Sequence, residues 1–171
     1  MRLFNGVYSI DNLPQHPGPK LLVANTDTSD DPGQHWMAIS VDGCGNGQFF
    51  DSFGRPPTGT FRDYLNKHCR TLTYNKIQLQ SAASELCGQY CVVWCVFISR
   101  KVALSSLLSS VYTGLNDSII RSIVERINIS MLCENVFFLY IHTQTDRRTD
   151  SVQQQQGRLT LSMPGEAIIR S

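Results

Sequence analysis

The stretch Cys87-Gly-Gln-Tyr-Cys-Val-Val-Trp-Cys-Val-Phe-Ile-Ser99 decides the fold of this chain. From Gly88 to Arg100 the apolar residues occupy every side of a helix rather than one stripe, and such a helix is buried with neighbours all round. We therefore expect it to be the central helix of the protein. Cys87 lies at or near its N-terminus, where unpaired backbone N–H groups favour an anion such as a thiolate.

Short apolar runs upstream of this helix predict the strands of a sheet, and the fold class is therefore α+β. The predicted strands are Lys20–Ala24, Trp36–Val41, Gln48–Phe53 and Tyr74–Leu79. The second and third flank a glycine-rich turn at 42–47, which is typical of an antiparallel hairpin with a longer loop. Thr60 with Asp63 resembles a helix-capping box, and further amphipathic helices are expected at 103–113 and from Asp117 onward.

The bulk properties indicate one globular domain with an extension. The 171 residues are 42% apolar and 17% charged, and the net charge of +1 does not indicate nucleic-acid binding. We assign residues 1–128 to the domain and 129–171 to a C-terminal extension, flexible from about 143, with a strand at 136–142 as an option. No signal peptide and no apolar run of roughly 20 residues is evident, so we expect an intracellular protein, in cytoplasm or nucleus, without a membrane anchor.

The predicted hairpin brings a histidine and a carboxylate together. His35 stands eight residues before Gly43, which lies near the apex, and Asp51 stands eight residues after it. Equal arms place both side chains at the open end of the hairpin, on the same face. Asp51 also interrupts an aromatic strand, where an unpaired carboxylate would be costly. An imidazole held by a carboxylate is a better base, and Cys87 is the best-placed nucleophile for it.

Two further features bear on the chemistry. Gln80, seven residues before Cys87, could donate its side-chain amide to an oxyanion. Cys91 and Cys95 follow Cys87 at helical spacing, but zinc usually needs a closely spaced pair and a second pair, so we assign both to the core and expect no metal. The six cysteines are expected to be reduced, because the chain can bury a core without disulfides and carries no export signal.

Together these residues resemble the superfamily of adenain and the ubiquitin-like-protein (SUMO) proteases. The matching stretches are Gly33-Gln-His-Trp36, Phe50-Asp-Ser-Phe-Gly54 and Gln80-Ser-Ala-Ala-Ser-Glu-Leu-Cys-Gly-Gln-Tyr-Cys91. The order His, Asp, Gln, Cys is that of the superfamily, and the match covers about residues 4–127. The forms Asp-Ser-Phe-Gly and Cys-Gly-Gln-Tyr-Cys, with the opening Phe4-Asn-Gly-Val-Tyr8 and Asp11-Asn-Leu-Pro14, look closest to adenain-like proteases of Maverick or Polinton elements and DNA viruses.

The resemblance implies a papain-like core, with a small mixed or antiparallel sheet around the central helix. It implies His35 as base, Asp51 as its orienting residue, Cys87 as nucleophile and Gln80 as oxyanion donor, with Trp36 and Gly88 shaping the substrate channel. It further implies an endopeptidase that cuts polypeptides near glycine and matures viral or mobile-element structural proteins, in part within a virion. No cofactor is expected and the chain is expected to be a monomer. An activating peptide remains an option, as in adenovirus protease.

Three other functions stay open at this stage. The first is removal of ubiquitin-like modifiers by isopeptide cleavage. The second is an inactive binding module that kept the fold. The presence of suitable residues at all four catalytic positions argues against it. The third is a redox or metal-binding protein built on Cys87, Cys91 and Cys95.

Overall fold

The computed structural model describes residues 4–101 and 116–131. Within these ranges the chain forms a five-stranded mixed sheet, three α-helices and one short 3-10 helix, which confirms the α+β class. In chain order the elements are β1 Gly6–Tyr8, the 3-10 helix Ile10–Asn12, β2 Lys20–Asn25, β3 Trp36–Val41, β4 Asn46–Asp51, α1 Gly59–His68, β5 Thr71–Tyr74, α2 Cys87–Ser99 and α4 Asn116–Met131.

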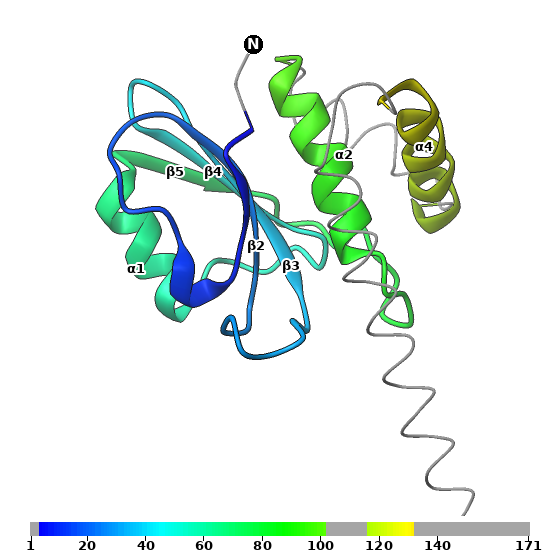
Figure 1. Ribbon diagram of the computed structural model, residues 1–171, viewed down its shortest axis with the longest axis horizontal. Coiled ribbons are helices and arrows are strands. Elements are labelled where there is room, and N and C mark those ends of the chain that lie inside the picture. Colours follow the sequence, from blue (N-terminus) through cyan, green and yellow to red (C-terminus); the bar gives the residue numbers. More distant parts are fainter. Residues whose placement is uncertain (1–3, 102–115, 132–171) are drawn as a thin grey trace, which may run out of the picture.

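The strands lie in the sheet in the same order as in the chain, from β1 to β5. The central strands β2, β3 and β4 pair antiparallel, whereas the outer pairs β1–β2 and β4–β5 are parallel. Every residue of β2 and β3 is buried, because helices cover both faces of the sheet (Figure 1). This explains why both strands are mostly apolar along their length rather than alternating between apolar and polar residues.

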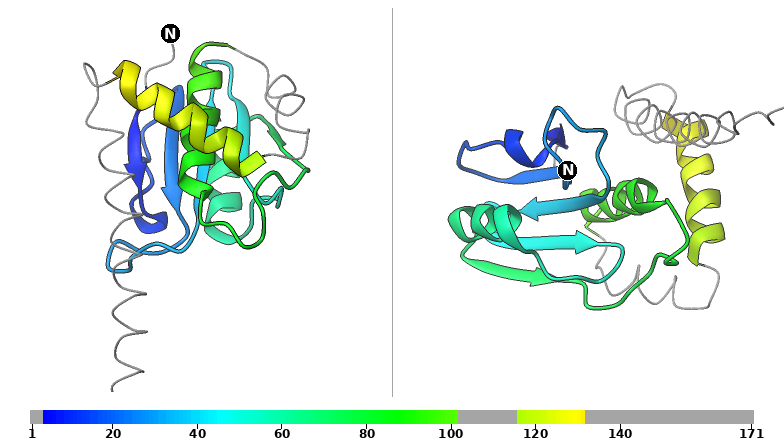
Figure 2. Two further views of the ribbon diagram at one scale, coloured as in Figure 1. Left: turned by 90° about the vertical axis from the view of Figure 1, so that its right-hand side faces the viewer. Right: turned by 90° about the horizontal axis from the view of Figure 1, so that it is seen from below.

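The two faces of the sheet divide the core into two clusters. On one face, Val23, Ala38 and Phe50 pack against α2, and the Phe50 ring stacks on the Trp94 ring with centroids 5.6 Å apart. On the other face, α1 packs through residues such as Phe61 and Leu65. Helix α4 packs against α2 through Ile120 and Val124, so that α2 is enclosed between the sheet and α4 (Figures 1 and 2).

The central helix confirms the main expectation. Helix α2 begins at Cys87, and nine of its thirteen residues are buried. Helix α4 also begins where the sequence predicted a helix, near Asp117. In the described parts of the chain, no helix combines the length and the apolar character needed to cross a bilayer.

Several local expectations were wrong. The fifth strand is Thr71–Tyr74 rather than 74–79, because after Tyr74 the chain leaves the sheet and the Asn75 side chain takes over the pairing with β4. Strand β4 ends at Asp51, since a turn closed by Gly54 N–H on the Asp51 carbonyl begins there. Helix α1 has Thr58 as its N-cap, without a side-chain capping bond, so the box at Thr60 does not form. The predicted helix at 103–113, the strand at 136–142 and the extension from 132 lie outside the described residues.

The hairpin register differs slightly from the one expected. Met37 pairs with Asp51 and Val41 with Gly47, which centres the turn on Cys44 rather than on Gly43. His35 therefore lies diagonally opposite Asp51, two residues beyond its direct partner. Because the side chains of a strand alternate with a period of two, the shift keeps both groups on one face.

Candidate functional site

His35 and Asp51 are paired at the open end of the β3–β4 hairpin. The His35 Nε2–H donates to Asp51 Oδ1 at 2.7 Å, and Asp51 is 2% exposed. The Phe53 backbone N–H donates to the same oxygen at 2.9 Å, and the Phe53 ring lies 5.1 Å from the imidazole, centroid to centroid. The His35–Asp51 contact is an ion pair when His35 is protonated. The pairing predicted from the hairpin is thus confirmed.

The backbone of Asp51 is held by Asn75, a buried residue just after β5. Asn75 Oδ1 accepts the Asp51 N–H at 3.0 Å, and Asn75 Nδ2 donates to the Asp51 carbonyl oxygen at 2.6 Å. One side-chain amide thereby supplies both hydrogen bonds that a neighbouring strand would give. Nearby, Gly54 has a φ of +70°, and a Cβ there would lie 2.6 Å from the Ile77 carbonyl carbon. The absence of a side chain lets the 77–78 backbone pack onto the turn that carries Asp51.

Replacing Asn75 with alanine is expected to lower the free energy of unfolding by about 1–3 kcal/mol, because the buried Asp51 N–H loses its partner and the Asp51 carbonyl keeps only the Gly54 N–H. Urea denaturation of the variant and the wild type measures this. Asn66→Ala, at an exposed position of α1, is the matched control and should change stability by less than about 0.5 kcal/mol. Equal effects at the two positions would show that the Asn75 bonds do not hold Asp51.

Cys87 opens α2 and is the third member of the cluster. It is buried, and together with Asp51 it changes the titration of His35. Burial disfavours the imidazolium, but hydrogen bonds and charges from Asp51 and Cys87 outweigh burial and raise the pKa of His35 to about 9. Since Nε2 is bound to Asp51, Nδ1 is the ring nitrogen left for a hydrogen bond to another group.

The four other described cysteines differ from Cys87 in their surroundings. All five described cysteines, Cys87 included, are free thiols; Cys44 is exposed and Cys69 is half-buried. Burial raises the pKa of Cys91 well above its ordinary value, raises that of Cys95 as well, and raises that of Cys69 despite the nearby Lys20. Such thiols stay protonated near neutral pH and react slowly, because the thiolate is the nucleophile. None of these thiols shares the His35 contact.

The remaining predicted residues lie around this cluster in different ways. Gln80 is 2% exposed, with Ser52 Oγ–H donating to its Oε1 and its Nε2 donating to the Ser84 carbonyl, both at 2.6 Å. The contact with Ser84 uses one of the two amide hydrogens of Gln80. Gly88 is buried in the first turn of α2. Trp36 is also buried and belongs to the core cluster that includes α2.

Two residues of this region were not found from sequence, namely Asn75 and Ser52. Asn75 was placed inside a predicted strand, and Ser52 was noted only as a neighbour of Asp51. Their partners lie 24 and 28 residues away in the chain, and no short-range pattern indicates such contacts. The stretch 71–80 holds polar residues at about every second position, so the residue type of Asn75 gives no signal of its own.

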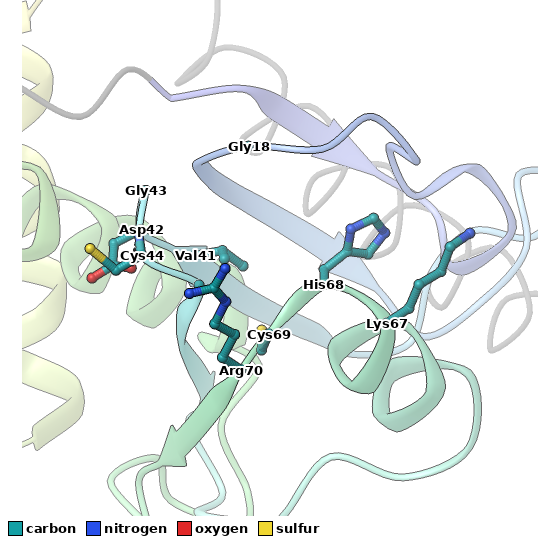
Figure 3. Close-up of a pocket in the computed structure, with 10 residues that line it drawn as sticks. Gly18, Val41, Asp42, Gly43, Cys44, Lys67, His68, Cys69 and Arg70 are labelled. Carbon is teal, nitrogen blue, oxygen red and sulfur yellow. Dashed lines mark hydrogen bonds between the residues drawn. The ribbon is translucent and has the colours of Figure 1, made fainter.

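A cavity of about 280 Å³ lies at the other end of the hairpin (Figure 3). Its lining comes from the 42–45 turn, Gly18 and Val41, and the end of α1 with Arg70. Because β3 runs from His35 to this turn, the cavity is separated from the His35–Asp51 pair by the length of the strand. Its lining includes the thiols of Cys44 and Cys69. Among the described residues, no group of three or more His, Cys, Asp or Glu side chains could hold a metal ion.

No family model matches the sequence, and no curated protein matches it. The structure is similar to a crystal structure of the ASFV pS273R protease, with 22% sequence identity and a TM-score of 0.46 over 60% of this chain and 40% of that chain. A selenomethionine crystal structure of the same protease matches with 27% identity and a TM-score of 0.42 over 60% and 41% of the two chains. The chain thus spans about two fifths of the length of that protease.

Proposed function

We propose that this chain is a cysteine peptidase with Cys87 as nucleophile, His35 as general base and acid, and Asp51 as the residue that orients His35. The 2.7 Å contact between His35 Nε2 and Asp51 Oδ1 is the observation that supports this most. It fixes the ring so that Nδ1 is free for Cys87, which stands at the first residue of a buried helix. Nucleophile, base and orienting carboxylate are the parts that acyl transfer needs.

The proposed reaction begins with transfer of the Cys87 proton to His35 Nδ1. A histidine whose pKa is raised to about 9 carries a proton at neutral pH and can hold it for the leaving amine. The thiolate attacks the substrate carbonyl, and the imidazolium then gives its proton to the leaving amine. Water, activated by the same imidazole, releases the acyl group and restores the thiol.

Stabilisation of the oxyanion is assigned to Gln80 and to backbone N–H groups at the start of α2. The N-terminus of a helix favours negative charge, and the Gln80 amide keeps one hydrogen beyond its bond to Ser84. Electrostatic stabilisation of this kind is usually the largest single contribution in acyl transfer.

The finer proposal is an adenain-like endopeptidase that cuts viral or mobile-element structural polypeptides near glycine. It rests on the resemblance of the sequence stretches around His35, Asp51 and Cys87. In that assignment Trp36 and Gly88 border a narrow substrate channel that excludes large side chains. Conjugates of ubiquitin-like modifiers are the competing substrate class, and the same chemistry would release the modifier from them.

Profiling of new N-termini in an amine-blocked proteome tests this function, with wild type and Cys87→Ala in parallel. The wild type is expected to create N-termini that follow small residues, glycine above all, and the variant none. Reaction with ubiquitin-like vinyl sulfones separates the two substrate classes, because only an enzyme that binds those modifiers is labelled. A wild type that neither cuts nor reacts would contradict the proposal and favour an inactive binding module.

A further inference from the structure

Ser52 links the two halves of the candidate site, because it follows Asp51 directly and contacts the Gln80 loop three times. Its carbonyl oxygen accepts the N–H groups of Leu79 at 2.8 Å and Gln80 at 3.1 Å. Its hydroxyl donates to Gln80 Oε1 at 2.6 Å. Ser52 has no exposed surface, so water does not replace these bonds.

These contacts also fix which way round the Gln80 amide lies. Gln80 Nε2 faces the Ser84 carbonyl, which can only accept a hydrogen bond. The oxygen of the amide must therefore face Ser52, whose hydroxyl supplies the matching hydrogen. A flipped amide would set its oxygen against the Ser84 carbonyl. The arrangement presents an N–H group, not an oxygen, in the remaining direction.

The Gln80 loop is further tied to the helix that carries Cys87. The Tyr90 hydroxyl, one turn into α2, lies within hydrogen-bond distance of the Leu79 carbonyl at 2.9 Å and of an Asp117 carboxylate oxygen at 2.8 Å. Ser52 on one side and Tyr90 on the other thus hold the backbone next to Gln80 against both β4 and α2. Of these contacts, the Ser52 hydroxyl is the one that acts on the side-chain amide itself.

We propose that Ser52 is a positioning residue that fixes the orientation of the Gln80 amide, so that the Asp51–Ser52 pair holds the base with one residue and the oxyanion donor with the next. The inference rests on the proposed function, because it assigns the Gln80 N–H to the oxyanion. Ser52 itself touches no reacting atom. Its removal should therefore weaken the step that develops an oxyanion and leave the reactivity of the thiol unchanged.

Ser52→Ala is expected to lower kcat for a peptide substrate roughly 10- to 100-fold with little change in KM, while Gln80→Ala lowers it roughly 100-fold or more. The double variant should be no slower than Gln80→Ala alone, because Ser52 acts through Gln80. Alkylation of Cys87 by iodoacetamide, a displacement that forms no oxyanion, should run at the wild-type rate in Ser52→Ala. Ser81→Ala, at an exposed position of the same loop, is the matched control and should keep full activity.

Three results would overturn the inference: an unchanged kcat in Ser52→Ala, effects that multiply in the double variant, or a slower Cys87 alkylation in Ser52→Ala. The rate at which the Gln80 side-chain amide protons exchange with solvent, measured by NMR, tests the Ser52–Gln80 hydrogen bond without any substrate turnover. It should accelerate in Ser52→Ala, and an unchanged exchange rate also contradicts the inference. A wild type that cleaves no peptide contradicts the proposed function instead, and the exchange measurement still decides whether Ser52 holds Gln80.

Discussion

Replacing Cys87 with alanine is expected to reduce peptide hydrolysis by roughly a factor of 10⁴ or more, because the variant lacks the atom that forms the acyl intermediate. The substitution removes one sulfur at the first residue of α2, so the fold should persist with a small loss of stability. Steady-state kinetics on a peptide substrate, with circular dichroism to confirm the fold, measures both effects.

Two other thiols serve as controls for this result. Cys44→Ala removes an exposed thiol at the far end of the hairpin, and Cys95→Ala removes a buried thiol two turns along the same helix. Both variants should keep a kcat within a few-fold of the wild type. A large loss of activity in Cys44→Ala, or full activity in Cys87→Ala, would assign the chemistry to a different thiol.

Asp51→Asn is expected to lower kcat/KM roughly 100-fold at neutral pH. An equivalent swap in a serine protease costs roughly 10⁴-fold because the histidine takes the wrong tautomer. Here the Phe53 N–H donates to the same oxygen as His35, so the amide oxygen should occupy the Oδ1 position and the tautomer should survive. The expected loss of activity then comes from removing the negative charge that stabilises the imidazolium.

The same variant should change two pH dependences. In the wild type the imidazolium persists up to the His35 pKa of about 9, and this sets the alkaline limit of activity. Without the carboxylate charge the pKa of His35 falls, so the alkaline limit should move to lower pH. Because the folded-state pKa lies above the ordinary value of 6.5, His35 stabilises the fold fully below about pH 6.5, and this stabilisation is lost as the pH rises to about 9.

Urea denaturation between about pH 6.5 and 9 measures how the free energy of unfolding depends on pH. The fall that is due to His35 should be smaller in Asp51→Asn than in the wild type. Burial is the main cause of the raised pKa of the Cys91 and Cys95 thiols and is the same in both proteins, so the difference in slope reports chiefly on the His35–Asp51 pair. An alkaline limit and a stability slope that stay unchanged in the variant would show that Asp51 does not set the charge of His35.

The parts of the fold that could be predicted from sequence are those in which burial alone dictates the pattern. Strands β2 and β3 and helix α2 are mostly apolar on all sides because other elements pack on both sides of them, and their bounds were found to within one residue. Strand β1 has only three half-buried residues and pairs in parallel with β2, which no local pattern indicates. Strand β5 was misplaced because its register depends on β4 and on the side chain of Asn75.

In the candidate site, too, the contacts within one local element could be predicted from sequence and the long-range contacts could not. The His35–Asp51 contact followed from the symmetry of a hairpin, which is a local property, and survived a one-residue error in the centre of the turn. The bonds from Asn75 and Ser52 join segments that meet only in the folded chain. Their residue types are ordinary, so only their distances from Asp51 and Gln80 reveal what they do.

The most direct test of the central claim is to identify which residue a peptidyl vinyl sulfone ending in glycine modifies. The reagent would be applied to the full chain at stoichiometric concentration and the adduct mapped by peptide mass spectrometry. Modification of Cys87, in preference to the more exposed Cys44, and its loss in His35→Ala are the results that the proposed mechanism predicts. Modification of Cys44 alone, or of Cys87 at the same rate with and without His35, would contradict it.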